Sequence, residues 1–238
     1  MSKRGNNGWS LQPMGDRCLI IEFESRVAPE VNGRVRSVAE HLLSHPIEGV
    51  VDIVPAFTTV AVHYRPEAVR DGPPSESPYR RLCRSIERIL AQGIARTDVG
   101  ARVVEVPVCY GGEFGPDLAH VAAFAKMTEP EVIALHSANI HRVFMLGFVA
   151  GFAYMGIVDA RIAIPRHATP RVRVPLGSVG IAGVQTGVYP AETPGGWQLI
   201  GRTPVKPFDA SRAEPFLMKA GDRVQFTPID RTDYDRLS

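Results

Sequence analysis

From Val143 onward the chain contains no stretch with the period of a long helix. Its apolar residues occur in short runs: VFMLGF, RIAIP, RVRVP, VGIAGV, WQLIG and RVQFTPI. The turns between these runs are rich in glycine, which allows a positive φ, and in proline, which withholds an amide donor. Many short strands joined by such turns are typical of a β-barrel or another closed sheet. We therefore expect a barrel in this half.

Two short helices are expected to lead into the barrel. The first has apolar residues at helical spacing between Leu118 and Ala125. The second is expected at about 129–138, because Thr128 and Glu131 have the spacing of a capping box.

The first hundred residues alternate between strand and helix patterns. Strands are expected at 15–25, 50–54, 58–64 and 102–108, with one helix before Pro46 and another after Pro78. This β-α-β-β-α-β order is typical of a ferredoxin-like domain, although the last strand could belong to the next domain instead. We therefore predict an α+β chain, with a ferredoxin-like domain at residues 1–100 and a barrel domain at 101–238.

Composition excludes several classes of protein. The chain is 45% hydrophobic and 22% charged, as in ordinary globular proteins, and its net charge of +2 gives no basic surface for nucleic acid or anionic membrane. No apolar run approaches the roughly 20 residues that span a bilayer, and the first residues do not resemble a secretory signal. Three cysteines without a CxxC pair indicate a reducing compartment. We expect a cytoplasmic protein.

Metal and nucleophile motifs are weak. His120, His136 and His141 lie near one another in sequence but lack metal-ligand spacing, so we expect no metal. Ser178 lies in LGSVG, which lacks the first glycine of a nucleophile elbow, and a turn serine is favoured. Cys109 has no evident activating base, so a buried small residue is favoured there too.

Arginines are concentrated in two loop motifs, PRHATPRVRVP and IGRTP. Arg166, Arg171 and Arg202 each lie beside a proline or glycine turn, where the backbone is preset. The planar guanidinium suits carboxylate or phosphate. Arg173 has no flanking turn, so an exposed strand arginine is an equally good interpretation of it. Since no Walker motif is present, a nucleotide site would consist of arginines and loop amides.

Aromatic residues alternate with glycine in LGFVAGFAYMG (146–156), and QTGVYPAETPGGWQLIGRTP (185–204) places Trp197 in a shaped loop. Such aromatics either line a concave ligand site or fill a bent barrel strand, and the spacing does not decide between the two. Uncovered aromatics also mark interfaces. We therefore expect an apolar partner surface at Phe148, Phe152, Tyr154 and Trp197.

These motifs carry a resemblance to a known family. GFVAGFAYMG, PRHATPRVRVPLGSVGIAGVQTGVYPAETPGGWQLIGRTP and AGDRVQFTPI together resemble the B subunit of the bacterial ATP-dependent 5-oxoprolinase, whose family is also named allophanate hydrolase subunit 1 or KipI. The resemblance covers residues 15–229. The family usually has proline at Ala150 and serine at Thr193, and the first departure bears on the turn before Gly151.

The resemblance implies a small α+β domain followed by a cyclophilin-like β-barrel. It also implies two partner proteins, the homologous C subunit of 5-oxoprolinase and its separate A subunit. With them the lactam of 5-oxoproline is opened at the expense of ATP, with Mg²⁺. The chain is then expected to be inactive alone. A cyclophilin-like fold does not by itself imply prolyl isomerase activity.

ATP could activate the lactam as a phosphorylated imidate, with arginines and loop amides holding the charge that develops. On this hypothesis we assign the motif residues to roles. The residues assigned to catalysis are His136, as an acid/base, Arg166 and Arg202. The residues assigned to substrate binding are Arg171, Gln185, Tyr189, Phe148, Tyr154 and Trp197. The residues assigned to ATP binding are Gly177, Ser178, Gly195 and Gly196.

Two other functions stay open. A KipI-like protein would inhibit a histidine kinase through its C-terminal domain. A carboxyltransferase-type subunit of allophanate or urea metabolism would work with a biotin enzyme, although this chain has no biotinyl Met-Lys-Met motif.

Overall fold

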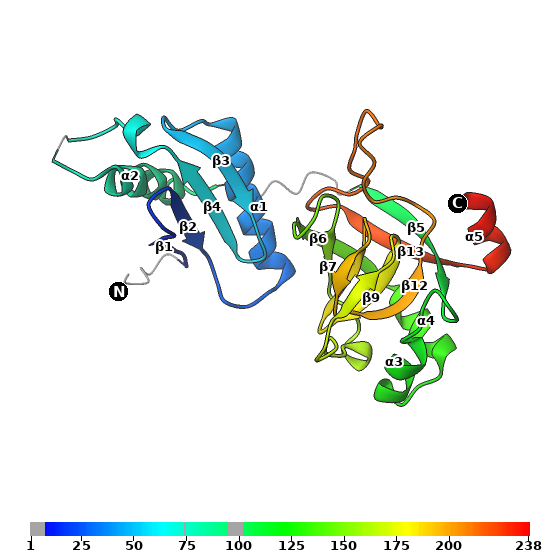
Figure 1. Cartoon of the computed structure of the whole chain (residues 1–238). Coiled ribbons are helices and arrows are strands. Elements are labelled where there is room, and N and C mark those ends of the chain that lie inside the picture. Colours follow the sequence, from blue (N-terminus) through cyan, green and yellow to red (C-terminus); the bar gives the residue numbers. More distant parts are fainter. Residues whose placement is uncertain (1–7, 74, 95–101) are drawn as a thin grey trace. The chain divides into compact units, whose positions relative to one another are not determined.

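The two halves of the chain form separate sheets. The structure is a computed structural model that describes residues 8–73, 75–94 and 102–238. The chain divides into two compact units, Met1–Val99 and Gly100–Ser238 (Figure 1). Each unit has its own hydrophobic core. The predicted α+β class, a sheet domain followed by a closed barrel, is confirmed. The predicted boundary at residue 100 lies outside the described residues. None of the described helices is both long and apolar enough to cross a membrane.

The first unit is a four-stranded antiparallel sheet with two helices. Its elements are β1 (Ser10–Pro13), β2 (Cys18–Glu22), α1 (Pro29–Ser44), β3 (Val50–Pro55), β4 (Thr59–Tyr64), a 3₁₀ turn η1 (Pro66–Ala68) and α2 (Pro78–Ala91), with the sheet in the order β1-β2-β4-β3. Leu19, Val62 and Ile53 lie side by side on one face of the sheet. They share a core with Val35 of α1 and Ile86 of α2, so both helices cover that face.

The edge strand of this sheet differs from the prediction. The strand expected at 102–108 belongs to the second unit, which was the stated alternative, and β1 pairs with β2 at that edge instead. The β1 strand is hard to recognise in the sequence, because it is short and ends in Pro13, whose missing amide restricts it to sheet edges. The split β-α-β arrangement is therefore completed from the N-terminal side.

Seven strands close the barrel of the second unit. In barrel order they are β10 (Gln185–Val188), β7 (Ala153–Gly156), β6 (Ile140–Leu146), β13 (Arg223–Ile229), β5 (Val103–Tyr110), β12 (Gln198–Arg202) and β9 (Ser178–Ala182), which pairs back onto β10. All neighbours are antiparallel except β5 and β13, which run parallel.

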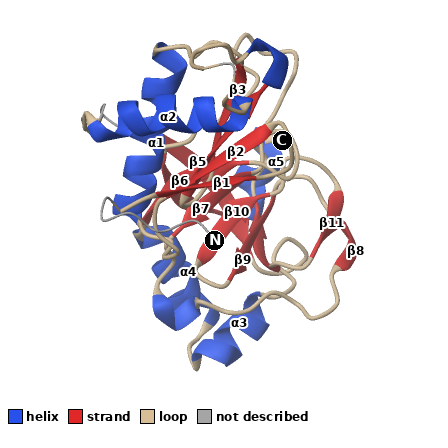
Figure 2. Cartoon of the chain, turned by 90° about the vertical axis from the view of Figure 1, so that its left-hand side faces the viewer, coloured by secondary structure: helices blue, strands red, loops and turns tan. Residues whose placement is uncertain are grey.

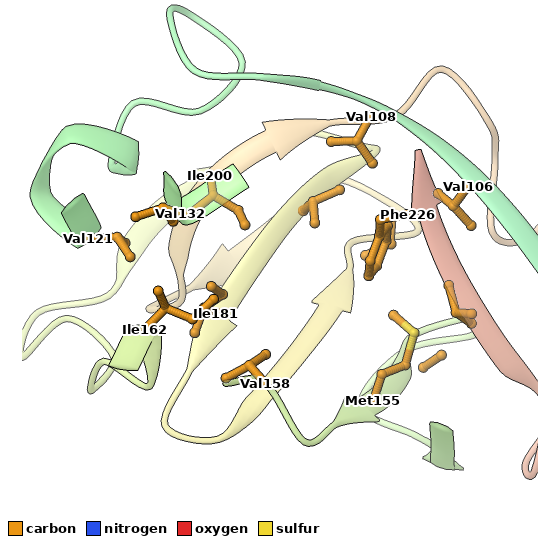
Figure 3. Close-up of a cluster of buried hydrophobic side chains, with 14 of the residues drawn as sticks. Val106, Val108, Val121, Val132, Met155, Val158, Ile162, Ile181, Ile200 and Phe226 are labelled. Carbon is orange, nitrogen blue, oxygen red and sulfur yellow. The ribbon is translucent and has the colours of Figure 1, made fainter. Parts of the chain in front are cut away.

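Short elements surround the barrel. They are the helices α3 (Leu118–Ala125), α4 (Glu129–Ala138) and α5 (Arg231–Leu237), the 3₁₀ turn η2 (Ala160–Ile162), and a two-stranded sheet of β8 (Arg171–Val174) and β11 (Thr193–Gly195). This small sheet lies apart from the barrel strands in Figure 2. The capping box predicted at Thr128 is present. Val121 of α3 and Val132 of α4 join barrel residues such as Ile181 and Phe226 in one core (Figure 3).

A chain of hydrogen bonds crosses this core through His136, whose side chain has no exposed surface. Its Nδ1 lies 2.7 Å from Tyr110 Oη and its Nε2 lies 2.8 Å from Thr186 Oγ1. Thr186 donates its one hydroxyl proton to the Gly180 carbonyl, at 3.0 Å, so it must accept from Nε2–H. Nδ1 then accepts from the Tyr110 hydroxyl. The imidazole is thus held neutral by partners on β5 and β10.

A second buried histidine contacts the first. His141 Nε2 donates to the His136 carbonyl at 2.9 Å, and the two rings are 5.1 Å apart. Burial lowers the pKa of His136 well below 6.5, and the neighbouring His141 lowers it further. Burial also lowers the pKa of His141. Folding of the barrel therefore disfavours the protonated form of both rings.

This burial predicts a loss of barrel stability in acid. Below about pH 6.5 the unfolded chain binds protons that the folded barrel does not, so the free energy of unfolding falls as pH falls, by up to about 1.4 kcal/mol per pH unit for each histidine. Urea unfolding of a Trp9→Phe variant, which leaves Trp197 as the single tryptophan, should show this between pH 7.5 and 5.5. His136→Gln should reduce the pH dependence, whereas His120→Gln, at an exposed position on α3, should leave it in place. A pH-independent transition would contradict the assignment.

Candidate functional site

A hollow of about 280 Å³ opens on the second unit, and most of its lining comes from loops at the ends of short strands. The predicted site residues in its lining are Phe148, Tyr154, Arg166, Tyr189, Gly195, Gly196 and Trp197. Phe152, Pro170 and Pro194 complete it. We call this hollow the barrel pocket.

Aromatic side chains form the walls of the barrel pocket. Phe152 is buried at the centre, with its ring centroid 4.8 Å from that of Tyr154, 5.3 Å from that of Tyr189 and 5.4 Å from that of Trp197. All three contacts are edge-to-face, the arrangement that aromatic quadrupoles favour. Phe148 adds a fourth edge contact at 5.8 Å but is 61% exposed. The spacing left open whether these aromatics fill the core or line a ligand site, and in the structure they pack against one another and also line a hollow.

One of two neighbouring glycines allows the β11–β12 turn to approach the aromatic wall. A Cβ at Gly195 would lie 2.4 Å from Tyr189 Oη, which accepts a hydrogen bond from the Trp197 amide. At Gly196 the nearest atom would be 3.4 Å away, which is an ordinary contact. Gly195 is therefore required by the buried phenol of Tyr189, whereas Gly196 has room for a methyl group.

Arg166 supplies the charge at the barrel pocket. Its side chain is exposed, and within the described part of the chain no carboxylate lies within salt-bridge distance of its guanidinium. The loop that carries it is held at two points: the His167 amide donates to Gly196 O, and Gln198 Nε2 donates to Pro165 O, at 2.6 and 2.9 Å. An exposed guanidinium on a loop held in this way suits an anionic ligand.

Asp117, which precedes α3, anchors the segments around this loop. Its Oδ1 accepts from Arg171 at 2.6 Å, its Oδ2 accepts from the Leu199 amide at 2.7 Å, and His167 Nε2 lies 3.3 Å from Oδ2. Burial alone would raise the pKa of Asp117, but Arg171, the amide and His167 together lower it below its usual value. The carboxylate is therefore ionised and paired.

The other predicted arginines have different neighbours. Arg171, assigned to substrate, pairs with Asp117 and is not part of the pocket lining. The guanidinium of Arg202 lies over the Phe114 ring, 4.9 Å from its centroid, and Arg202 is not part of the pocket lining. Arg173 forms an exposed ion pair with Glu192 at 2.8 Å. Of these arginines, Arg166 is the one that lines the pocket, and it pairs with no carboxylate in the described part of the chain.

Several other assigned residues serve the fold. His136 lies in the core with both ring nitrogens bonded, so it cannot reach a ligand as an acid or base. Ser178 has no exposed surface, and a Cβ at Gly177 would lie 2.3 Å from Thr203 O, so both belong to a tight turn rather than to an ATP site. Gln185 begins β10 opposite Ala182 and is not part of the lining.

Sequence reasoning missed Asp117 and His167. Their partners lie far away in the sequence, so no local spacing indicated them, although both are polar residues close to prolines in loop segments. Within the described residues no group of three or more His, Cys, Asp or Glu could hold a metal ion.

The Gly195 contact predicts different effects at two adjacent positions. Gly195→Ala should lower the free energy of unfolding of the barrel by about 1–3 kcal/mol, because the new methyl group overlaps Tyr189. Gly196→Ala should change it by less than about 0.5 kcal/mol, since it meets only ordinary contacts. Urea midpoints in the Trp9→Phe background measure both. Equal effects at the two positions would contradict the packing described here.

Comparison with known proteins gives a consistent result. Residues 9–218 match the family described as carboxyltransferase domain, subdomain C and D. The chain is 43% identical to the 5-oxoprolinase B subunit of Bacillus subtilis over 95% of both chains, and 41% identical to that of Escherichia coli O157:H7 over 90% of this chain and 94% of the relative. The crystal structure of TTHA0988 is similar with a TM-score of 0.76 at 37% identity, over 90% of this chain but 40% of that one. The chain thus belongs to the family of 5-oxoprolinase B subunits, within the carboxyltransferase subdomain C and D proteins.

Proposed function

We propose that the chain acts as the B subunit of an ATP-dependent 5-oxoprolinase and that its barrel pocket binds 5-oxoproline. Family membership, with matches over nearly the whole of both chains, supports the activity. One structural observation carries the assignment to this pocket. The exposed guanidinium of Arg166, with no carboxylate partner among the described residues, lies at an aromatic hollow.

The chemistry of the substrate matches this lining. 5-Oxoproline is a flat five-membered lactam that carries one carboxylate. Its ring faces can pack against aromatic side chains such as Tyr154 and Trp197, and its carboxylate can accept two parallel hydrogen bonds from Arg166. A hollow of about 280 Å³ accommodates a compact ring acid of this size.

ATP fits this chain poorly. Of the residues assigned to it, Ser178 has no exposed surface and Gly177 is packed against Thr203. Gly195 and Gly196 line the barrel pocket, where Arg166 is the single cationic residue among the described lining. A triphosphate requires several cations or amides directed at one point. In this proposal, ATP and Mg²⁺ bind on the partner proteins.

The role of the chain is then to bind and orient the lactam. Among the described residues that line the pocket, none is a histidine, cysteine, serine or acid. The pocket can fix the carboxylate and exclude water from the ring faces, but a group that activates the amide must come from elsewhere. The A and C subunits, the partners implied by the resemblance, would supply that group together with the nucleotide site.

Reconstitution tests this proposal. The chain, purified alone and together with the A and C subunits, should show 5-oxoproline-dependent hydrolysis of ATP only in the assembled complex. An assembled complex without that dependence would contradict the proposal. Inhibition of a histidine kinase, or transfer of a carboxyl group from a biotin protein, would then favour one of the two other functions.

The unpaired charge predicts a specific effect of Arg166. Arg166→Ala should lower kcat/KM for 5-oxoproline about 10- to 100-fold, since a hydrogen bond to a charged group contributes about 1.5–3 kcal/mol. Arg166→Lys should recover part of the loss, because a point charge cannot form the bidentate contact.

Arg173→Ala is the matched control. It also removes an exposed arginine from the same segment, but one that is paired with Glu192 outside the pocket, so turnover should stay within about twofold of the parent's. Equal losses for Arg166→Ala and Arg173→Ala, or no loss for either, would contradict the substrate role of Arg166.

A further inference from the structure

Phe148 combines an exposed aromatic ring with an unfavourable backbone conformation. Its φ is 70°, and the amide of Val149 donates to Gly147 O at 2.9 Å, so Phe148 is the central residue of a γ-turn with positive φ. This is the rarer and more strained hand of the γ-turn. For a bulky residue a positive φ is an outlier, and glycine would adopt it without penalty.

The contrast with Lys126 supports this view. Lys126 is the other described non-glycine residue with positive φ, but it ends α3 in the left-handed region, where helices commonly end. Phe148 ends no helix. It lies between β6 and β7, where Gly147 and Phe152 close the loop with a hydrogen bond of 3.1 Å.

Packing of the Phe148 ring does not account for the strain. The ring is 61% exposed, and its aromatic contact is one edge of Phe152. A side chain that mainly stabilised the core would be buried, as Phe152 is. Backbone strain that is not offset by packing is typical of ligand sites. The strained turn therefore holds a flat apolar surface at the opening of the barrel pocket.

We infer that Phe148 determines the specificity of the barrel pocket: its ring, presented by the strained turn, covers the ring of the bound lactam and limits its size. This inference rests on the proposed function and adds a residue to it. Phe152 is a buried wall of the pocket, Tyr154 and Trp197 are half-buried walls, and Phe148 is its exposed aromatic wall. A five-membered ring would fit beneath it, and a six-membered ring would displace it.

Kinetics of the assembled complex test the contact. Phe148→Gly should raise KM for 5-oxoproline at least tenfold with kcat within about twofold, because the ring contributes binding and not chemistry. Phe148→Tyr, which retains the flat ring, should keep KM within about threefold. The parent should prefer 5-oxoproline over 6-oxopiperidine-2-carboxylate, its six-membered analogue, and Phe148→Gly should reduce that preference at least tenfold, since one methylene in a fitted pocket discriminates by about 10- to 200-fold.

Thermal unfolding of the full chain tests the strain separately. Phe148→Gly should unfold at a higher temperature than Phe148→Ala, the reverse of the usual order, because alanine keeps the Cβ that positive φ disfavours. If the Phe148 ring only stabilised the fold, Phe148→Gly and Phe148→Ala would both be less stable than the parent, and substrate preference would not change.

The inference is overturned if Phe148→Gly leaves KM and substrate preference unchanged, if Phe148→Ala is the more stable variant, or if Phe148→Gly prevents assembly with the partner proteins. The last result would make the ring part of an interface with those partners. Failure of the proposed function can be distinguished from failure of this inference. In that case the parent complex itself would show no 5-oxoproline-dependent turnover, and the specificity role of Phe148 would be contradicted as well.

Discussion

The buried carboxylate of Asp117 holds together the segments from which the barrel pocket is built. It binds the start of β12 through the Leu199 amide and β8 through Arg171, and it lies 3.3 Å from His167 in the loop that carries Arg166. A buried charge is tolerated only where it is paired and hydrogen-bonded. These three segments must therefore meet at one point, and the position of the pocket loop follows from it. Arg171 is used for this pairing, whereas the neighbouring Arg166 has no carboxylate partner among the described residues.

Two buried polar groups of the barrel show opposite solutions to the same constraint. Asp117 stays charged because a guanidinium and an amide compensate it. His136 stays neutral because its neighbours are a phenol, a hydroxyl and the Phe226 ring, 4.6 Å away, none of which carries charge. A histidine in such surroundings orders the core but is a poor proton carrier. This physical difference separates it from a catalytic histidine, and sequence position alone does not reveal it.

Much of the architecture follows from local sequence patterns. Which side chains belong to the site depends instead on contacts between residues that are far apart in the sequence. The loss of helical period after Val143 predicts the barrel, and the glycine and proline density around Trp197 predicts its shaped loop. Arg166 and Arg171 each follow a proline in the sequence, and the distant Asp117 pairs with Arg171. Similarly, the burial of Ser178 is set by the closure of the barrel, which no local spacing encodes.

The parallel seam between β5 and β13 has a consequence for the order of events during protein synthesis. It joins Val103, at the start of the barrel sequence, to Arg223, near its end. The ribosome therefore releases β5 long before its partner exists, and β5 has an unpaired edge on that side until β13 emerges. Contacts this far apart in sequence form slowly. Since an exposed strand edge is prone to pairing with other chains, the interval before closure is when a nascent barrel is most exposed to aggregation and most dependent on chaperones.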